Sequence, residues 1–172
     1  MMDKNVSIKL LYTALADELL AAYQYWVCKN LSRGEGKFDV DPEFEQHAKE
    51  EMEHADKIMD RLKQLGGTPI PDPKDWTKFS NPWDVVDFRD VEKQLEITMK
   101  AEQTAIDFYR NAIEQVKGED PTTHKLFRSI LADEEEHLYD LKELYSEFED
   151  DIFEEDINVF VDEVEDDDVF VD

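Results

Sequence analysis

Glu51-Met52-Glu53-His54 is the stretch that decides the fold of this chain, and a near copy, Glu134-Glu135-Glu136-His137, follows later in the sequence. On an α-helix, residues three apart lie on one face, so each Glu-x-x-His offers a carboxylate and an imidazole to one point in space. A dinuclear metal site in a four-helix bundle needs two such motifs and one further glutamate from each of the other two helices. The two motifs therefore predict an all-α protein, a four-helix bundle built around metal.

A lone glutamate precedes each motif, Glu18 by 33 residues and Glu102 by 32, counted to the glutamate of the motif. A tyrosine follows each lone glutamate by seven residues, at Tyr25 and Tyr109, which places it on the same helical face. One Glu-x-x-His in a chain with 45 acidic residues is typical of a solvated helix face, but two with matched partners favour a dinuclear site. The predicted metal ligands are Glu18, Glu51, His54, Glu102, Glu134 and His137.

Composition limits the function further. The 172 residues carry a net charge of −26, and 14 of the 45 acidic residues stand in residues 147–172, which contain no lysine or arginine. Such a chain repels nucleic acid and anionic membranes and attracts cations. Its single cysteine, Cys28, excludes an intrachain disulfide and suits a reducing cytoplasm. The apolar run that begins at Leu10 is cut short by Asp17, so we expect neither a signal peptide nor a membrane span.

Four helices are predicted from the apolar spacing and from the glycines and prolines that punctuate it. The second helix is expected to begin at Asp41-Pro42 and the fourth at Asp120-Pro121, because proline suits the first position of a helix. The expected bounds are about 6–32, 41–65, 90–116 and 121–148. The long connection between the second and third helices predicts a crossover, as in ferritin-like bundles.

The acidic C-terminal tail, residues 149–172, is predicted as an appendage to a bundle domain formed by residues 1–148. Its composition is typical of a solvated disordered segment. The alternative is a short motif or added strand that binds a protein partner, because Val159-Phe160-Val161-Asp162 is repeated at residues 169–172.

These motifs resemble the ferritin superfamily, in the region shared by bacterioferritins and Dps-like proteins, over about residues 7–147. Besides the two Glu-x-x-His motifs, the resemblance rests on three segments. They are the first-helix stretch ALADELLAAYQYW at residues 14–26, the turn LGGTP at residues 65–69, and DPKDW at residues 72–76.

The resemblance implies a ferroxidase that oxidises Fe(II) with O₂ or H₂O₂ and stores Fe(III) in a hollow homo-oligomer of 12 or 24 chains, with protection against oxidative stress. It also implies two irons per chain, bridged by two glutamates and completed by one Glu and His pair on each side. By position, the bridges are Glu51 and Glu134, and the pairs are Glu18 with His54 and Glu102 with His137.

Three departures from the family pattern matter. Many Dps-like relatives carry a cysteine pair beside the site, and the corresponding residues here are Pro82 and Thr104. Met52 stands at the position of the haem-binding methionine of bacterioferritins, although a packing role is the simpler interpretation. The acidic tail replaces the basic tails with which Dps proteins bind DNA, so we expect no nucleic-acid binding.

Several other residues have two interpretations. Tyr25 is either an electron donor near the irons or a structural partner of a carboxylate. His47 either helps to pass iron to the shell interior or is an exposed helix histidine. Trp26, Trp76 and Trp83 are expected in the core or under the crossover, and Cys28 is expected to pack as a small apolar residue.

Three functions stay open on the sequence. The first is the iron-storing ferroxidase. The second is a dinuclear peroxidase or a manganese catalase-type enzyme on the same bundle, without iron storage. The third is a scaffold or interaction protein that acts through the acidic tail, which would have no need of six matched ligands.

Overall fold

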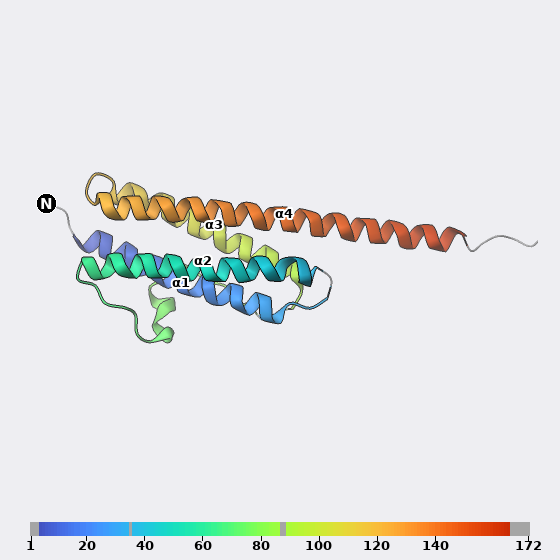
Figure 1. Cartoon of the computed structure of the whole chain (residues 1–172), viewed down its shortest axis with the longest axis horizontal. Coiled ribbons are helices and arrows are strands. Elements are labelled where there is room, and N and C mark those ends of the chain that lie inside the picture. Colours follow the sequence, from blue (N-terminus) through green and yellow to red (C-terminus); the bar gives the residue numbers. More distant parts are fainter. Residues whose placement is uncertain (1–3, 35, 87–88, 166–172) are drawn as a thin grey trace, which may run out of the picture.

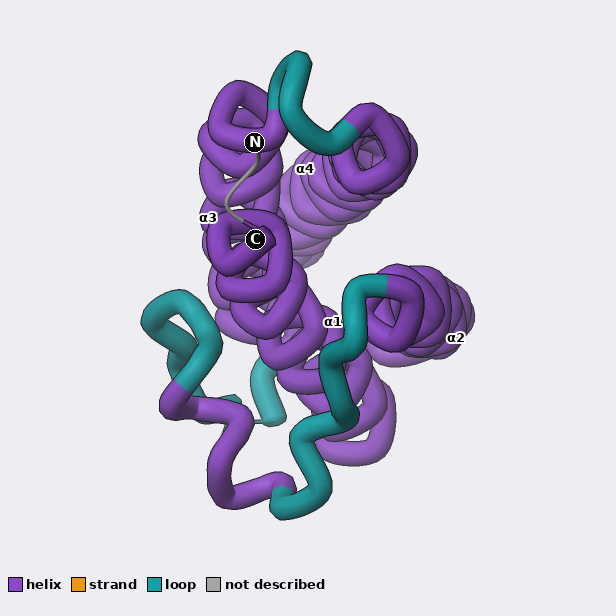
Figure 2. The backbone as a smooth tube through the Cα atoms, turned by 90° about the vertical axis from the view of Figure 1, so that its left-hand side faces the viewer, coloured by secondary structure: helices purple, strands orange, loops and turns teal. Residues whose placement is uncertain are grey.

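The computed structural model describes residues 4–34, 36–86 and 89–165, and the side chains of 6–34, 36–86 and 89–147. It contains four α-helices and one short 3₁₀ helix: α1 (Lys4–Leu31), α2 (Lys37–Gln64), η1 (Pro73–Lys78), α3 (Val91–Val116) and α4 (Pro121–Glu165). Two antiparallel pairs form the bundle, α1 with α2 and α3 with α4 (Figures 1 and 2). The predicted all-α four-helix bundle is confirmed.

The connection between α2 and α3 runs along the outside of the bundle and carries η1 (Figure 1). Asp17 of α1 holds this crossover, because its carboxylate accepts hydrogen bonds from the backbone N–H of Asn81 at 2.8 Å and from the side-chain amide at 2.6 Å. The crossover returns the chain to the other end of the bundle, as the sequence predicted, and α3 then runs beside α1.

Two apolar clusters fill the bundle, one on either side of the buried acidic residues. One contains Leu11, Ile58 and Phe127, and the other contains Phe44, Leu95 and Leu141, all without exposed surface. Fully burying one such side chain contributes roughly 1.5–3 kcal/mol. Cys28 lies in the second cluster and is fully buried, as the sequence predicted.

The start of α2 differs from the prediction. The helix begins at Lys37, one turn before Asp41, and Pro42 lies inside it. Gly36 adopts a positive φ of 69° that turns the chain, and Val40, in the added turn, is 2% exposed. Lys37 also pairs with Asp41 across that turn. These contacts outweigh the one backbone hydrogen bond that a proline near a helix end removes.

The fourth helix also differs, because it was predicted to end near Phe148 and instead runs to Glu165. No glycine or proline follows Pro121 in the sequence, so nothing in the backbone chemistry ends the helix. Its last part projects beyond the other three helices (Figure 1). Residues 149–165 are therefore helical, neither disordered nor a strand, and residues 169–172 lie outside the described part. The tail as a separate appendage stays a prediction.

Trp26 is not in the core, contrary to the prediction. Its side chain is 57% exposed and stacks on Tyr23, which is 51% exposed, with ring centroids 6.0 Å apart. Trp76 and Trp83 are half-buried at the crossover. Within the described ranges, no helix combines the length and the apolar character that crossing a membrane requires.

Candidate metal centre

All six predicted ligands converge at the middle of the bundle. Each helix contributes, because Glu-x-x-His of α2 and of α4 face inward and α1 and α3 each add one glutamate from the opposite side. None of the six is more than 3% exposed: Glu18 3%, Glu51 1%, His54 2%, Glu102 2%, Glu134 1% and His137 3%. Two overlapping sets of four, each with three carboxylates and one imidazole, have ligand atoms within 4.8 Å of one another.

The first set surrounds Nδ1 of His54. Glu51 Oε2 lies 3.1 Å from this nitrogen, Glu134 Oε1 lies 3.3 Å from it, and Glu18 Oε2 lies 3.4 Å from it. Three carboxylates from three helices therefore share one imidazole nitrogen. Three oxygens and one nitrogen form a donor set that suits first-row divalent metals.

The second set repeats this arrangement around Nδ1 of His137. Glu51 Oε1 lies 3.2 Å from this nitrogen, Glu134 Oε2 lies 3.7 Å from it, and Glu102 Oε1 lies 4.0 Å from it. Glu51 and Glu134 thus present one carboxylate oxygen to each histidine. A carboxylate that faces two imidazoles in this way has the geometry to bridge two cations.

Two outer carboxylates orient the histidines, and sequence reasoning missed both. Asp133 Oδ2 lies 3.0 Å from His54 Nε2, and Glu50 Oε2 lies 3.0 Å from His137 Nε2. A carboxylate on Nε2 fixes the ring so that Nδ1 faces the centre, as is usual for metal-bound histidines. The signal was in the sequence, because an acidic residue stands directly before each Glu-x-x-His.

Tyr25 and Tyr109 each form a hydrogen bond with the lone glutamate of the other helix pair. The phenol of Tyr25 donates a hydrogen bond to Glu102, and that of Tyr109 donates one to Glu18. Burial raises the pKa of both phenols well above the usual value, and the facing carboxylate adds to the rise. Both tyrosines therefore stay protonated and orient the carboxylates.

The cluster concentrates four buried carboxylates around two imidazoles, an arrangement that favours the binding of cations. Burial raises the pKa of Glu18 and of Glu102, and the Glu134 carboxylate adds to each rise. Burial alone would lower the pKa of His54 and of His137, but the close carboxylates of Glu134 and its neighbours outweigh burial and raise both pKa values, that of His137 to about 12. Without a cation, protons must therefore neutralise these carboxylates.

Several buried atoms of the six residues also have no hydrogen-bond partner. Leaving a buried polar atom unpaired costs about 1–3 kcal/mol, which a bound cation would offset. The unpaired atoms are Glu51 Oε1, Glu102 Oε2, Glu134 Oε1 and His137 Nδ1. The residues present thus fit a dinuclear metal centre.

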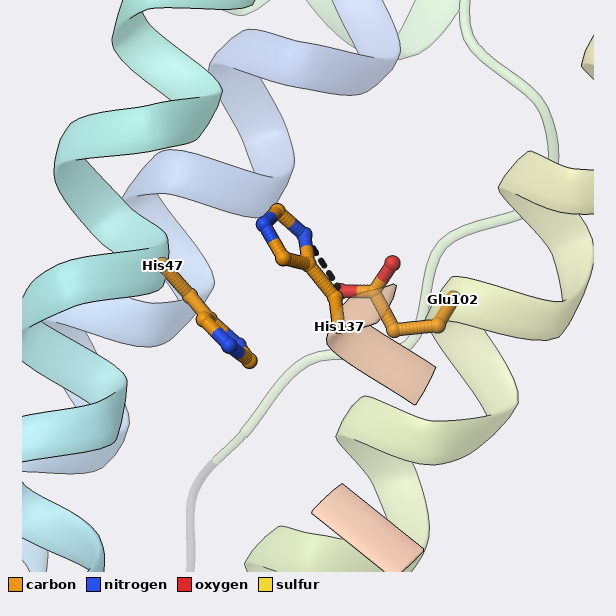
Figure 3. Close-up of side chains that lie close together, drawn as sticks. All are labelled: His47, Glu102 and His137. Atoms are coloured by element: carbon orange, nitrogen blue, oxygen red, sulfur yellow. Dashed lines mark ion pairs between the residues drawn. The ribbon is translucent and has the colours of Figure 1, made fainter. Parts of the chain in front are cut away.

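His47 lies directly beside this site, and the interpretation of His47 as an exposed helix histidine is wrong. Its side chain has no exposed surface, and its ring stacks on that of His137 with centroids 4.2 Å apart (Figure 3). The ring of Tyr25 packs edge to face against the ring of His47, with centroids 5.0 Å apart. Burial lowers the pKa of His47 to about 3, so the imidazole is neutral. Its spacing of four residues from Glu51 put it on the metal face, but spacing alone could not establish its burial.

Two cavities reach the centre from opposite sides. A cavity of about 60 Å³ adjoins Glu18, Glu51 and Glu102, and both Pro82 and Thr104 line it. The resemblance placed a relative's cysteine pair at these two positions, so in this chain the cavity carries no thiol there. The second cavity, of about 180 Å³, opens on the histidine side among acidic side chains that include Glu50, Glu53, Asp133, Glu136 and Asp140.

Met52 lies away from the six ligands, with 46% of its surface exposed. This agrees with its expected direction, one residue from Glu51 and about 100° round the helix. Haem binding by Met52 stays a prediction.

Known proteins share both the sequence pattern and the fold. A family model described as a ferritin-like domain matches residues 8–150. Bacterioferritin from Rhodobacter capsulatus is 30% identical over 132 residues, covering 76% of this chain and 77% of that protein. The DNA protection during starvation protein from Pyrococcus furiosus is 27% identical over 143 residues, covering 78% of this chain and 74% of that protein.

Solved structures agree. A dodecameric thioferritin, the bacterioferritin-related protein from Bacteroides fragilis, superposes with a TM-score of 0.81 at 37% identity, covering 85% of this chain and 88% of that one. Dps from Thermosynechococcus elongatus superposes with a TM-score of 0.77 at 21% identity, covering 81% of this chain and 90% of that one, and shares the fold.

Proposed function

The chain belongs to the family of ferritin-like domains, and from that premise we propose that it is a ferroxidase that oxidises Fe(II) and stores Fe(III). The observation that carries this proposal is the double set of contacts made by Glu51 and Glu134, each of which presents one oxygen to His54 and the other to His137. This arrangement suits two Fe(II) ions held side by side.

In this proposal, Glu51 and Glu134 would each offer one carboxylate oxygen to each of the two irons. The remaining ligands form one Glu and His pair for each iron, Glu18 with His54 and Glu102 with His137. Asp133 and Glu50 keep the imidazole Nδ1 atoms directed inward, while Tyr109 and Tyr25 hold the two outer glutamates. The six ligands are thus supported before iron arrives, which lowers the cost of ordering them.

Two adjacent Fe(II) ions supply two electrons together and become two Fe(III). If the oxidant is H₂O₂, its O–O bond takes both electrons and two protons to give two waters; if it is O₂, the same two electrons and two protons give H₂O₂. The proteins named bacterioferritin and DNA protection during starvation protein among the relatives support a role in iron storage and oxidative protection.

Storage requires a shell, and we propose that this chain assembles into a homo-oligomer of 12 or 24 copies. The structural relative from Bacteroides fragilis is dodecameric. Aromatic side chains stand outward on this chain as well, with Trp26 57% exposed, Tyr139 59% exposed and Phe38 85% exposed. Trp26 stacks on the exposed ring of Tyr23, and a contiguous exposed apolar patch is typical of surfaces that meet another chain.

Anaerobic loading with Fe(II), followed by O₂ or H₂O₂ in parallel, tests the proposal. Iron retained after gel filtration is counted per chain, with Glu51→Ala as the site variant and Glu135→Ala, an exposed acid of the second motif, as the matched control. Retention far above two irons per chain in a large assembly, lost in Glu51→Ala and kept in Glu135→Ala, is the expected result. Two or fewer irons with sustained peroxide turnover would instead indicate a dinuclear peroxidase.

A further inference from the structure

A second group of metal-binding side chains lies beside the dinuclear centre, on its histidine side. It consists of Glu43 and His47, one turn apart on α2, and Asp140 on α4. Ligand atoms of these three residues lie within 4.8 Å of one another. None of them is among the six ligands of the dinuclear centre.

His47 is the unusual member, because it is fully buried and has no hydrogen bond on either ring nitrogen. Its Nε2 nevertheless lies 3.1 Å from Glu43 Oε1, without the alignment of a hydrogen bond. A buried polar group without a partner is costly. Nε2 of His47 faces the carboxylate of Glu43, and the carboxylate of Asp140 lies close to both.

The pattern of a lone glutamate, a tyrosine and a Glu-x-x-His occurs twice in the sequence, and this repeat provides a control within the same chain. The position that corresponds to His47, four residues before the motif glutamate, is Ile130, which is fully buried in the apolar core. By the same correspondence Glu43 is matched by Leu126 and Asp140 by Lys57. Two carboxylates and an imidazole at one position between α2 and α4 thus correspond to two aliphatic side chains and an ammonium at the matching position.

We propose that Glu43, His47 and Asp140 form a third divalent-cation site between α2 and α4, with no counterpart at the matching position, which holds Leu126 and Ile130 of α4 and Lys57 of α2. The two carboxylates supply negative charge and the imidazole supplies a nitrogen, a donor set that suits Fe(II), Mn(II), Co(II) or Zn(II). Asp140 also lines the acidic cavity of about 180 Å³, and the Glu43 side chain is 27% exposed, so a cation can enter from solvent. The site goes beyond the proposed ferroxidase reaction and does not depend on it.

Anomalous diffraction from crystals of the full chain equilibrated with Co(II) tests this site. We expect a Co(II) peak among Glu43, His47 and Asp140, separate from those of the dinuclear centre. His47→Ile, which copies the residue of the other half, removes the peak or requires at least about tenfold more Co(II) to fill it. Glu43→Gln serves as a second variant in case the first does not fold.

Two further variants sharpen the test. Ile130→Val changes the matching core position without touching the site, and its third peak should equal that of the wild type. Glu18→Gln, a ligand variant of the dinuclear centre, should weaken that centre and leave the third peak in place, so failure of one site is distinguishable from failure of the other. No peak at His47 when the dinuclear centre is full, a peak unchanged in both His47→Ile and Glu43→Gln, or His47 bound together with Glu102 and His137 would each overturn the proposal.

Discussion

The two halves of the bundle, α1 with α2 and α3 with α4, agree closely at the centre and differ immediately beside it. Tyr25 holds Glu102 as Tyr109 holds Glu18, so each half supports a ligand of the other. Phe44 and Phe127 both lie seven residues before a motif glutamate and are fully buried. The shared features therefore belong to the dinuclear centre.

The difference lies at His47, whose counterpart is Ile130. A second difference lies at the start of the second helix of each pair. Asp120 caps α4 by accepting a hydrogen bond from the backbone N–H of Thr123 at 3.0 Å, whereas Gly36 gives α2 no side-chain cap. Features that only one half has cannot be required by the dinuclear geometry, so they indicate additional roles.

Removal of either proposed bridging glutamate should have the largest effect on metal binding. The effect should be the same whether the glutamate comes from α2 or from α4. Glu51→Ala and Glu134→Ala each take an oxygen from both metal positions. We expect each to weaken dinuclear Fe(II) binding by more than about 100-fold, since loss of an outer partner alone costs about 10–100-fold. Anaerobic equilibrium binding measures this. If either variant lost only one of the two metals, equal sharing of the bridges would be contradicted.

Substitution of the outer carboxylates should give the next largest effect. Each outer carboxylate contacts the histidine of the other helix pair. Asp133→Asn should lower metal affinity beside His54, and Glu50→Gln should lower it beside His137, each by about 10–100-fold. Site occupancies from anomalous diffraction at limiting Fe(II) separate the two positions. Equal loss at both positions in either variant would indicate that the outer carboxylates act through overall charge and not through one ring.

Proton release gives a pH dependence. Because contacts with carboxylates raise the pKa of His54 and of His137, both imidazoles hold protons at pH 7 in the absence of metal. A metal must displace these protons, so apparent affinity should rise with pH, by about tenfold per pH unit for each proton released. Calorimetry in buffers of different ionisation enthalpy counts the protons. Affinity that does not change between pH 6 and 8 would be incompatible with protonated imidazoles.

The smallest effect tests the difference in capping. Asp120→Ala should reduce the free energy of unfolding by about 1–2 kcal/mol at pH 7, because it removes the cap of α4 and the contact of Asp120 with Arg61 at 2.7 Å. Asp39→Ala, in the first turn of α2, makes a matched control with little expected loss. Urea titrations at a fixed chain concentration provide the comparison.

The sign of the pH effect at Asp120 follows from its pKa. Burial opposes the charged form, but hydrogen bonds from Thr123 and Arg61 outweigh it and lower the pKa from 3.8 to about 2. The stabilisation by the carboxylate is therefore present above pH 4 and is lost as the pH falls through about 2. The difference between wild type and Asp120→Ala should narrow over that window. A constant difference would contradict the assigned hydrogen bonds.

The convergence of the six candidate ligands could be predicted because helical spacing is a strong constraint, and a repeated Glu-x-x-His leaves little freedom. The start of α4 at Asp120-Pro121 could also be predicted, because a helix cap is a local feature of the sequence. Burial was harder to predict. Spacing put Trp26 on an apolar stripe, but Tyr25 and Cys28 face the core at this level of α1, and the indole is exposed.

Other features depend on partners that are distant in sequence. The burial of His47 requires the ring of His137 on another helix, and the roles of Glu50 and Asp133 require the two motifs to face one another. The predicted start of α2 was wrong. The cap-and-proline signal at Asp41-Pro42 is local, whereas burial of the Val40 side chain against other helices stabilises one more turn before it.

The most direct test of the account is anomalous diffraction at the iron edge from crystals loaded anaerobically with Fe(II). We predict two peaks at the centre of the bundle, about 3.5–4 Å apart as in other two-metal sites. One peak should lie by His54 and Glu18, the other by His137 and Glu102, with Glu51 and Glu134 contacting both. A single peak, or iron bound only at the surface, would contradict the dinuclear centre.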